Sequence, residues 1–291
     1  MSRWLVLVNP QAGRKAVDGL VIRDVLAAAG VEGVVEQPTS VAEMRRTAVE
    51  ASTDLDLVVV GGDGTVSLVV DALMHAAPER MPTIGILPNG TGCDLLKTFG
   101  IPGTMEGAAR HLRGTTTYQI DVGRLDGEWG RRHFVNVAQA GAGAAAAETA
   151  PRLPRRWGSA RYPIAFAARL PGFPAAELEV QGNRGYRGPA LAVVLANAQF
   201  FAGGWNIAPK AMLMDGELDV QVINARKRQA VGIVPRIIKG THLSLPQVQR
   251  MSLASLSVRT SVPWPVEVDG DHIGSTPFDA RVIPGAVTLK I

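Results

Sequence analysis

Hydrophobic positions over the first 120 residues fall into two alternating patterns, short continuous runs and runs with helical spacing. The continuous runs WLVLV, GVVEQ, LDLVVV and TIGIL are bounded by turn residues and predict four strands. Helical spacing between them predicts helices over residues 16–29, 40–52 and 65–76, with Ser40 as an N-cap. Strands that alternate with helices through short turns predict an α/β domain with a parallel sheet covered on both faces.

The pattern changes after Asp121 to short runs separated by turn signals. These runs are HFVNVA, AELEVQG, LAVVLAN, ELDVQVI, LASLSVR, WPVEVDGD and AVTLKI. They predict a mainly antiparallel β-sandwich, interrupted by helices over 159–170 and 228–239. We therefore expect two domains, residues 1–123 and 124–291, and leave open whether the last strand returns to the first domain.

Composition narrows the class of protein. The chain has 291 residues, of which 46% are hydrophobic and 19% charged, as in globular domains. The single cysteine, Cys93, excludes a disulfide framework and a cysteine metal cluster. The apolar run at the N-terminus ends at Asn9 and Pro10 and is too short for a signal sequence, so we expect a soluble, cytoplasmic chain.

Positive charge is concentrated in the second half of the chain. No Asp or Glu occurs within residues 149–176 or 220–266, although both windows contain several Lys or Arg. This pattern predicts an anionic partner, a membrane surface or a nucleic acid, or else a solvated basic face without a partner. Residues 151–173 combine five arginines with Trp157 and other aromatic residues, which is typical of a membrane-interface segment or of a core helix with a solvated basic side.

Candidate chemistry begins at the glycine-rich end of the third predicted strand, LVVVGGDGTVS. Glycines at the carboxyl end of a parallel strand let a phosphate approach the backbone amides, and the following helix N-terminus adds partial positive charge. A carboxylate beside a phosphate is repulsive unless a cation lies between them, so Asp63 suggests Mg²⁺ that bridges to a nucleotide. The alternative is a tight turn in which Asp63 is only the helix N-cap.

Two further strand ends support a phosphate site. The first strand ends in NPQAG, with Asn9, and the fourth ends in LPNGTG, with Asn89, Gly90 and Thr91. Since parallel strands end at one edge of a sheet, we expect these turns to lie beside GGDGT. LPNGTG lacks the Lys of a Walker loop, and GAGAAA lacks the context of a dinucleotide fingerprint and predicts close packing of small residues.

The motifs VNPQAG, VVVGGDGTVSLVVDAL, GILPNGTGCDLLKTFGIP, IDVGRL, NAQFFAGGWNIAPKAMLMDGELDV and PVEVDGD follow one another in the order seen in a known family. Together they resemble the catalytic domain of diacylglycerol kinases and related lipid kinases, including soluble bacterial members and sphingosine kinases. The nucleotide domain of that family is similar to that of NAD kinases. The resemblance covers most of the chain and implies ATP-dependent transfer of the γ-phosphoryl group to a lipid hydroxyl, with diacylglycerol as the first choice.

The resemblance also implies roles for individual residues. ATP phosphates would be held by the turn and first helical residues, with Thr39, Asn9, Asn89, Gly90 and Thr91 as further nucleotide contacts. The turn residues are Gly61, Gly62, Asp63, Gly64, Thr65, Val66 and Ser67. Asp121 would belong to the charged network around the active-site Mg²⁺. A second, structural Mg²⁺ would bind Asp215 and the backbone carbonyls of Met212 and Glu217.

The general base of the family is the Glu of a DGE motif, and Asp271 occupies that place here. Asp is one methylene shorter, a loss of about 1.5 Å of reach, and an Asp-Gly pair is also a good hairpin turn. The stretch AGAGAAAAE has alanines where the family usually has Phe. These departures leave open a nucleotide- or lipid-binding protein with little kinase activity, a kinase of another lipid such as a long-chain base, or one of a soluble metabolite such as NAD.

The expected partner is a lipid substrate at a membrane surface, with peripheral association of the chain. The basic windows contain no aromatic-basic recognition motif, so we expect no nucleic-acid partner. A homodimer is possible, and the sequence does not decide it.

Overall fold

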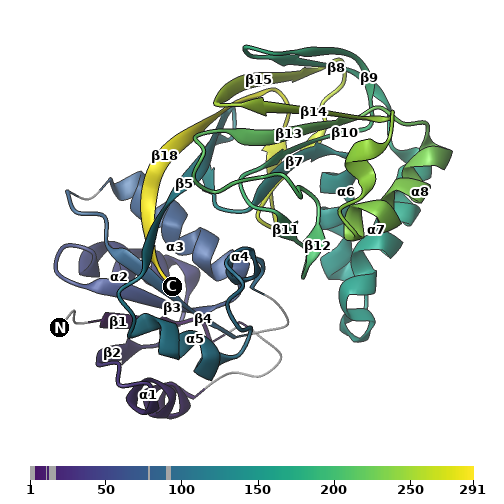
Figure 1. Ribbon diagram of the computed structural model, residues 1–291. Coiled ribbons are helices and arrows are strands. Elements are labelled where there is room, and N and C mark those ends of the chain that lie inside the picture. Colours follow the sequence, from purple (N-terminus) through teal and green to yellow (C-terminus); the bar gives the residue numbers. More distant parts are fainter. Residues whose placement is uncertain (1–3, 11, 13–17, 78, 90–92) are drawn as a thin grey trace. The chain divides into compact units, whose positions relative to one another are not determined.

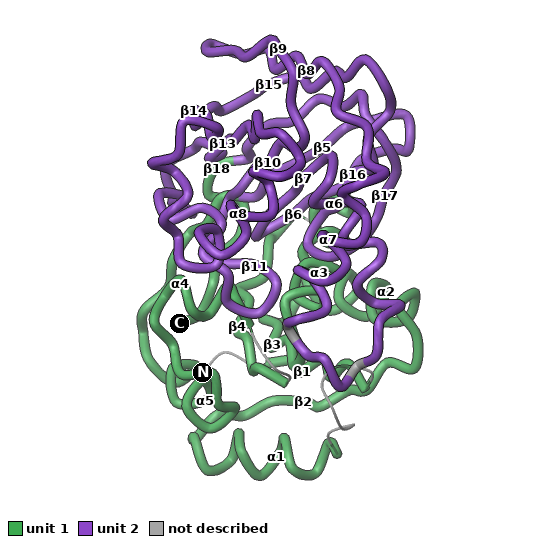
Figure 2. The backbone as a smooth tube through the Cα atoms, turned by 90° about the vertical axis from the view of Figure 1, so that its right-hand side faces the viewer, with its two compact units in different colours: residues 1–121, 284–291 green, residues 122–283 purple. Residues whose placement is uncertain are grey.

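The computed structural model describes residues 4–10, 12, 18–77, 79–89 and 93–291. The chain divides into two compact units (Figure 2). Unit 1 comprises residues 1–121 and 284–291, and unit 2 comprises residues 122–283. The sequence placed the boundary between residues 123 and 124, and the last residues of the chain belong to unit 1.

Unit 1 is a parallel sheet with helices, as the alternating pattern predicts (Figure 1). Its elements are β1 (Trp4–Val8), α1 (Gly19–Ala28), β2 (Gly33–Glu36), α2 (Val41–Ala51), β3 (Asp56–Gly61), α3 (Asp63–Ala76), β4 (Thr83–Pro88), α4 (Asp94–Thr98), α5 (Met105–Leu112) and the start of β5 (Thr117–Gly127). The strand order is β2-β1-β3-β4, and the end of β18 (Phe278–Lys290) pairs in parallel with β4. The predicted α/β class is confirmed.

Local sequence explains where the helices of unit 1 begin. Ser40 is the N-cap of α2, and its side chain accepts a hydrogen bond from the Glu43 N–H at 3.1 Å. Helix α1 starts at Gly19, later than predicted, because Asp18 is its N-cap and accepts from the Leu20 N–H. Helix α2 packs on β1 and β3, and α3 packs on β3, where the β-branched and leucine side chains are buried.

Unit 2 is a mainly antiparallel β-sandwich with helices, which confirms the second part of the predicted fold class. Its strands are β6 (Gly130–Phe134), β7 (Val137–Gly141), β8 (Ala176–Gln181), β9 (Tyr186–Ala190), β10 (Ala192–Ala196), β11 (Phe200–Phe201), β12 (Trp205–Asn206), β13 (Leu218–Ile223), β14 (Val248–Leu253), β15 (Ser255–Thr260), β16 (Pro265–Val268) and β17 (Asp271–Ser275). Its helices are α6 (Ala142–Thr149), α7 (Arg161–Arg169) and α8 (Lys227–Ile238), with short 3₁₀ turns at Ala150–Arg152, Arg155–Ala160, Leu170–Gly172 and His242–Ser244.

One sheet of unit 2 has the order β14-β13-β10-β7-β16-β17, and β18 joins β15, β8 and β9 in the other. Trp264, Phe134 and Phe278 are fully buried in the core between them. The GAGAAA stretch forms the start of α6, and its alanines are buried in close packing, as expected. None of the described helices has the length and apolar composition that crossing a bilayer requires.

Candidate active site

The carboxyl ends of β1, β3 and β4 meet at one edge of the sheet of unit 1. The Asn9 N–H donates to the Val60 carbonyl at 3.1 Å, and the Asn89 N–H donates to the Gly61 carbonyl at 3.0 Å. The Asn9 side chain also donates to the Thr65 hydroxyl at 2.9 Å. The structure thus brings the first, third and fourth strand ends together around the glycine-rich turn.

The turn leads directly into α3, whose N-cap is Gly62. Gly62 has no side chain with which to cap the helix N-terminus itself. A Cβ at position 61 would lie 2.5 Å from the Thr65 hydroxyl oxygen, so only glycine fits there. Gly64 faces open space, since a Cβ added there would have no described atom within 4 Å. An open helix N-terminus of this kind suits a phosphate group.

Asp63 is not the N-cap of α3, because Gly62 occupies that position, so the alternative in which Asp63 only caps this helix is wrong. Its two carboxylate oxygens accept hydrogen bonds from the backbone N–H groups of Asp94, at 2.9 Å, and Leu95, at 3.1 Å. The sequence does not show this contact, because about 30 residues separate the partners. Asp63 therefore caps α4 from outside that helix, and its role as a partner of Mg²⁺ stays a prediction.

We predict that Gly61→Ala and Gly64→Ala have different effects on the fold. Gly61→Ala must displace Thr65 and with it Asn9, so we expect the free energy of unfolding to fall by about 1–3 kcal/mol and ATP affinity to fall at least tenfold. Gly64→Ala places a methyl group in open space within a helix, which costs no stability. Thermal melts with and without Mg-ATP check this, and equal destabilisation by both variants would contradict it.

The remaining predicted nucleotide contacts of unit 1 are less directly placed. Thr39 follows β2, and its N–H and hydroxyl both donate to Glu43 Oε2 at 2.7 Å. These bonds, led by that of the hydroxyl, lower the pKa of Glu43. The side chains of Val66 and Ser67 are buried in α3, so a ligand at the turn would meet their backbone or none of their atoms. Gly90 and Thr91 lie outside the described residues.

Asp121 and Cys93 are both buried. Asp121 Oδ1 accepts from the Gly285 N–H at 2.8 Å, which ties the end of the chain to β5. Its predicted place in a Mg²⁺ network stays a prediction. Burial, with nearby Asp63, raises the pKa of the Cys93 thiol, so this cysteine has a packing role.

In unit 2, Met212, Asp215 and Glu217 lie on one loop before β13. Asp215 is exposed, and its Oδ1 accepts from the Glu217 N–H at 3.1 Å around Gly216, which has φ of +73°. Carboxylate and backbone carbonyl oxygens are donors of the type that Mg²⁺ prefers. The loop therefore fits the predicted structural cation in its chemistry, and the site stays a prediction.

Asp271 begins β17, directly after a tight hairpin turn formed by Asp269 and Gly270 with φ of +46° and +98°. Its side chain is 66% exposed and accepts from Arg132 Nη2 at 2.8 Å. The hairpin that the Asp-Gly pair predicts is present, and it holds the predicted base at a solvent-accessible position.

Asp269 has a role that the sequence did not reveal. Its carboxylate accepts from three backbone N–H groups, those of Val135 at 3.0 Å, Asn136 at 3.1 Å and Val137 at 2.9 Å. The first Asp of the DGD motif thus fastens the turn to the junction between β6 and β7. Charge-assisted hydrogen bonds of this kind are stronger than neutral ones, so the turn that carries Asp271 is well anchored.

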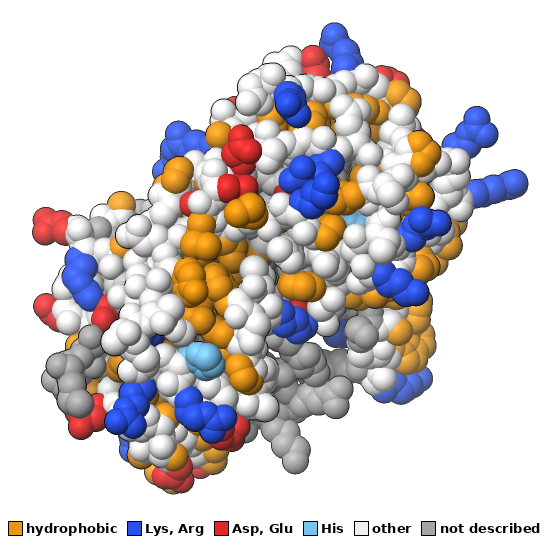
Figure 3. Space-filling view, in the orientation of Figure 1, with side chains coloured by type: hydrophobic (Ala, Val, Ile, Leu, Met, Phe, Trp, Pro, Cys, Tyr) orange, Lys and Arg blue, Asp and Glu red, His pale blue; other side chains and the backbone are white. Residues whose placement is uncertain are grey.

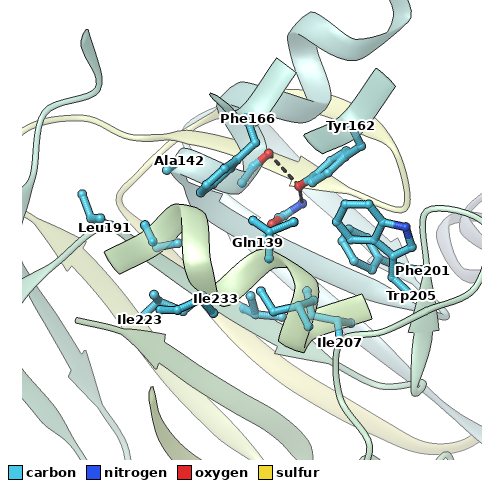
Figure 4. A pocket seen from close by; sticks show the side chains of 16 residues that line it. Gln139, Ala142, Tyr162, Phe166, Leu191, Phe201, Trp205, Ile207, Ile223 and Ile233 are labelled. Carbon is cyan, nitrogen blue, oxygen red and sulfur yellow. Dashed lines mark hydrogen bonds between the residues drawn. The ribbon is translucent and has the colours of Figure 1, made fainter. Parts of the chain in front are cut away.

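Unit 2 also contains an apolar cavity bounded by α7, α8 and the sheet of β7 and β10 (Figure 4). Its lining includes Phe166, Phe201, Trp205, Ile207 and Ile233. The cavity has a volume of about 40 Å³ and is partly open to solvent. Ala142 and Gly143 of the AGAGAAAAE stretch and Phe201 of the NAQFFAGGW motif line it, whereas the lining residues of α7 and α8 belong to none of the quoted motifs.

Two polar side chains, Gln139 and Tyr162, interrupt the apolar lining, and behind them lies Glu267. Burial, with smaller contributions from Asp269 and Asp271, raises the pKa of Glu267 to about 7. Burial also raises the pKa of Tyr162, which stays neutral. Asp271 is singled out from the sequence as a site residue, but Gln139 and Glu267 are not.

Comparison with known proteins identifies the family. Residues 3–125 match the diacylglycerol kinase catalytic domain, and residues 136–291 match the YegS C-terminal NAD kinase β-sandwich-like domain. The chain is 25% identical over 308 residues to a protein of Xanthomonas oryzae named probable lipid kinase YegS-like, in a match that covers 100% of this chain and 96% of the relative.

Two further relatives agree. A Stenotrophomonas maltophilia protein named probable lipid kinase YegS-like is 27% identical over 81% of this chain and 78% of its own length. A Staphylococcus haemolyticus protein named diacylglycerol kinase is 28% identical over 77% of this chain and 67% of its own length. The crystal structure of a diacylglycerol kinase from Bacillus anthracis is similar in fold, with a TM-score of 0.76, 21% identity and coverage of 99% and 96% of the two chains. The chain belongs to the YegS-type lipid kinases, which combine a diacylglycerol kinase catalytic domain with an NAD-kinase-like β-sandwich.

Proposed function

We propose that this chain transfers the γ-phosphoryl group of ATP to the hydroxyl group of a lipid, with diacylglycerol as the favoured acceptor. The observation that supports it most is the meeting of three strand ends, through Asn9, Gly61 and Asn89, at the open N-terminus of α3. Backbone N–H groups of the turn and of the helix start would bind the phosphates. Such positioning supplies much of what phosphoryl transfer needs.

Mg²⁺ would neutralise charge on the phosphates when bound. The glycine-rich turn contains one carboxylate, that of Asp63, which could hold the cation. Each of its two oxygens accepts a backbone N–H bond, so a cation at this place would share a carboxylate that also caps α4. Carboxylate oxygens are the ligands that Mg²⁺ prefers, and in this respect the residue type fits the cation.

Asp271 is the proposed general base, which would take the proton from the lipid hydroxyl. Its exposed carboxylate lies on an anchored turn, so it is both accessible and held in place. The apolar cavity of unit 2 supports an apolar acceptor. Diacylglycerol in particular is suggested by the name of the Staphylococcus haemolyticus relative.

The test is an incubation with labelled ATP, Mg²⁺ and a panel of lipids in mixed micelles that includes diacylglycerol and a long-chain base. Label in diacylglycerol supports the proposal in full, and label in another lipid alone corrects the acceptor. ATP binding without label in any lipid would reject kinase activity on the panel.

A second candidate is a nucleotide- and lipid-binding protein with little turnover. It is favoured by the Asp271 side chain, which is shorter than Glu and forms an ion pair with Arg132. It predicts stabilisation by ATP without phosphoryl transfer even at high protein concentration. A coupled assay for NADP formation separates both proposals from phosphorylation of NAD.

We further propose that unit 2 docks on anionic membranes through α7, α8 and the 3₁₀ turn before α7. Large apolar side chains on these elements are exposed by 39–51%, namely Trp157, Ile164, Val231 and Ile238. Neighbouring cations include Arg156, Arg161, Arg228, Arg236 and Lys239, and the two sequence windows that contain these elements have no Asp or Glu. Figure 3 shows Lys and Arg next to hydrophobic side chains along the edge of the molecule where these helices lie. Exposed apolar groups among cations fit an anionic bilayer surface.

We predict that replacement of Arg228, Arg236 and Lys239 by Gln weakens binding to anionic vesicles by about 10- to 100-fold, since each cation near the surface adds up to ~1 kcal/mol. The measurement is co-sedimentation with phosphatidylserine-containing vesicles at low and high salt. The matched control removes three exposed cations from another part of unit 2, Arg184, Arg187 and Arg259. Equal loss in both variants would show that net charge alone, and not this surface, determines binding.

A further inference from the structure

Glu267 and Gln139 form a buried cross-strand pair at the centre of unit 2. Strands β16 and β7 run antiparallel with these two residues opposite each other, so their side chains share a face of the sheet. They are 4% and 2% exposed, and Gln139 Nε2 donates to Glu267 Oε2 at 2.6 Å. A carboxyl group buried to this extent is costly unless its oxygens are satisfied, which makes its other contacts informative.

On one side, the pair is connected to the apolar cavity. Gln139 Nε2 also donates to the Tyr162 hydroxyl at 3.0 Å, and that hydroxyl donates to the Gly143 carbonyl at 2.9 Å (Figure 4). Gln139, Tyr162 and Gly143 all line the cavity. A Cβ at position 143 would lie 2.1 Å from Gln139 Oε1, so glycine is needed there to leave room for the amide. The polar part of the cavity wall is thus closely fitted around Gln139.

On the other side, the pair is connected to the turn that precedes the proposed base. Glu267 Oε1 accepts from the Gly270 N–H, and Gly270 lies between Asp269 and Asp271 at the tip of the hairpin. Asp269 anchors the turn to residues 135–137. The hydrogen bond to Glu267 anchors Gly270, the next residue of the turn. One carboxyl group therefore bonds to the cavity wall with one oxygen and to the catalytic turn with the other.

We propose that Glu267 is a positioning residue, which couples the occupancy of the apolar cavity, through Gln139 and Tyr162, to the position of Asp271. An apolar chain that enters the cavity must pack against the Gln139 amide and the Tyr162 ring, and any movement of the amide changes the hydrogen bond to Glu267. Asp271 would then reach its working position when a chain is bound, which limits proton abstraction in its absence. This inference rests on the proposed role of Asp271 as base.

The charge on Glu267 supports the coupling. Its pKa of about 7 means that the group changes between acid and carboxylate near neutral pH, and only the carboxylate forms charge-assisted bonds to both Gly270 and Gln139. The titratable groups around it are Asp269, Asp271 and Tyr162, and His272 is its register partner on β17. His272 is exposed and lies opposite Glu267, so its replacement serves as the control.

The prediction concerns three variants, Glu267→Gln, Gln139→Met and the control His272→Gln. The first two are expected to lower kcat for the lipid about 10- to 100-fold, because misplacement on the order of 1 Å costs about a hundredfold. The KM for ATP should stay unchanged. In the pH profile of kcat, an inflection near 7 should be present in the wild type and in His272→Gln, and absent from Glu267→Gln.

A readout that does not need turnover is the backbone amide resonance of Gly270, measured by NMR. In the wild type we expect it to titrate near pH 7 and to shift when 1-octanoylglycerol is added, and in Gln139→Met we expect no shift with the lipid. Those two results without any phosphorylated lipid would support the coupling and reject the proposed function. Phosphorylated lipid together with a Gly270 resonance that responds neither to pH nor to 1-octanoylglycerol would overturn the coupling.

Discussion

Asp271→Asn is expected to lower kcat for lipid phosphorylation by about 10²- to 10⁴-fold, the usual contribution of a general base. The fold should be retained, because Asn keeps an oxygen that can accept from Arg132, and the side chain is 66% exposed. ATP affinity should also be retained, since the change removes a proton acceptor and no proposed nucleotide contact. The measurements are kcat and KM with labelled ATP in mixed micelles, with ATP affinity from thermal shifts.

The matched control for this variant is Asp279→Asn. Asp279 is 64% exposed and pairs with Arg259 at 3.3 Å, so it has nearly the same exposure and the same type of partner. Asp271→Glu tests reach, since Glu extends about 1.5 Å further and is expected to keep or raise kcat. Full activity in Asp271→Asn would remove Asp271 as the base.

The sequence predicted the fold well because local patterns and long-range packing agree in this chain. Strands β1, β3 and β4 of unit 1 are buried, so they appear as continuous apolar runs. Ser40 and the Asp269-Gly270 pair mark a helix start and a hairpin by their own chemistry. The meeting of Asn9 and Asn89 with the glycine-rich turn follows from a rule of parallel sheets. Such features need only neighbouring residues or one topological rule.

The parts of the site that the sequence did not reveal depend on contacts between distant segments. Gln139 and Glu267 are separated by 128 residues, and nothing near either one signals a shared hydrogen bond. The anchoring of the turn by Asp269 and the capping of α4 by Asp63 are of the same kind. A buried Glu in a strand with apolar neighbours, PVEV, was the one available sign that position 267 has a polar partner.

The second large effect is expected for Asp63→Asn, which separates the two roles of this carboxylate. As a cap, Asp63 accepts from the N–H groups of Asp94 and Leu95, and Asn retains one of these two acceptors. The free energy of unfolding should therefore fall by about 1 kcal/mol, the size of a lost helix cap. As a partner of Mg²⁺, the carboxylate cannot be replaced by an amide, so phosphoryl transfer should fall at least a hundredfold. The measurements are chemical denaturation and the lipid kinase assay.

ATP affinity measured with and without Mg²⁺ separates the two roles of Asp63 further. Without Mg²⁺, removal of a negative charge beside the phosphates should leave ATP binding equal or tighter, whereas binding of Mg-ATP should weaken, because the bridging cation loses a ligand. Thr104→Ala is the control for stability, since Thr104 caps α5 by accepting from the Gly107 N–H at 3.2 Å and has no proposed role in catalysis. If Asp63→Asn is destabilised as much as Thr104→Ala but keeps Mg²⁺-dependent ATP binding and transfer, Asp63 serves only to cap α4. The cation between turn and phosphate would then need a different ligand.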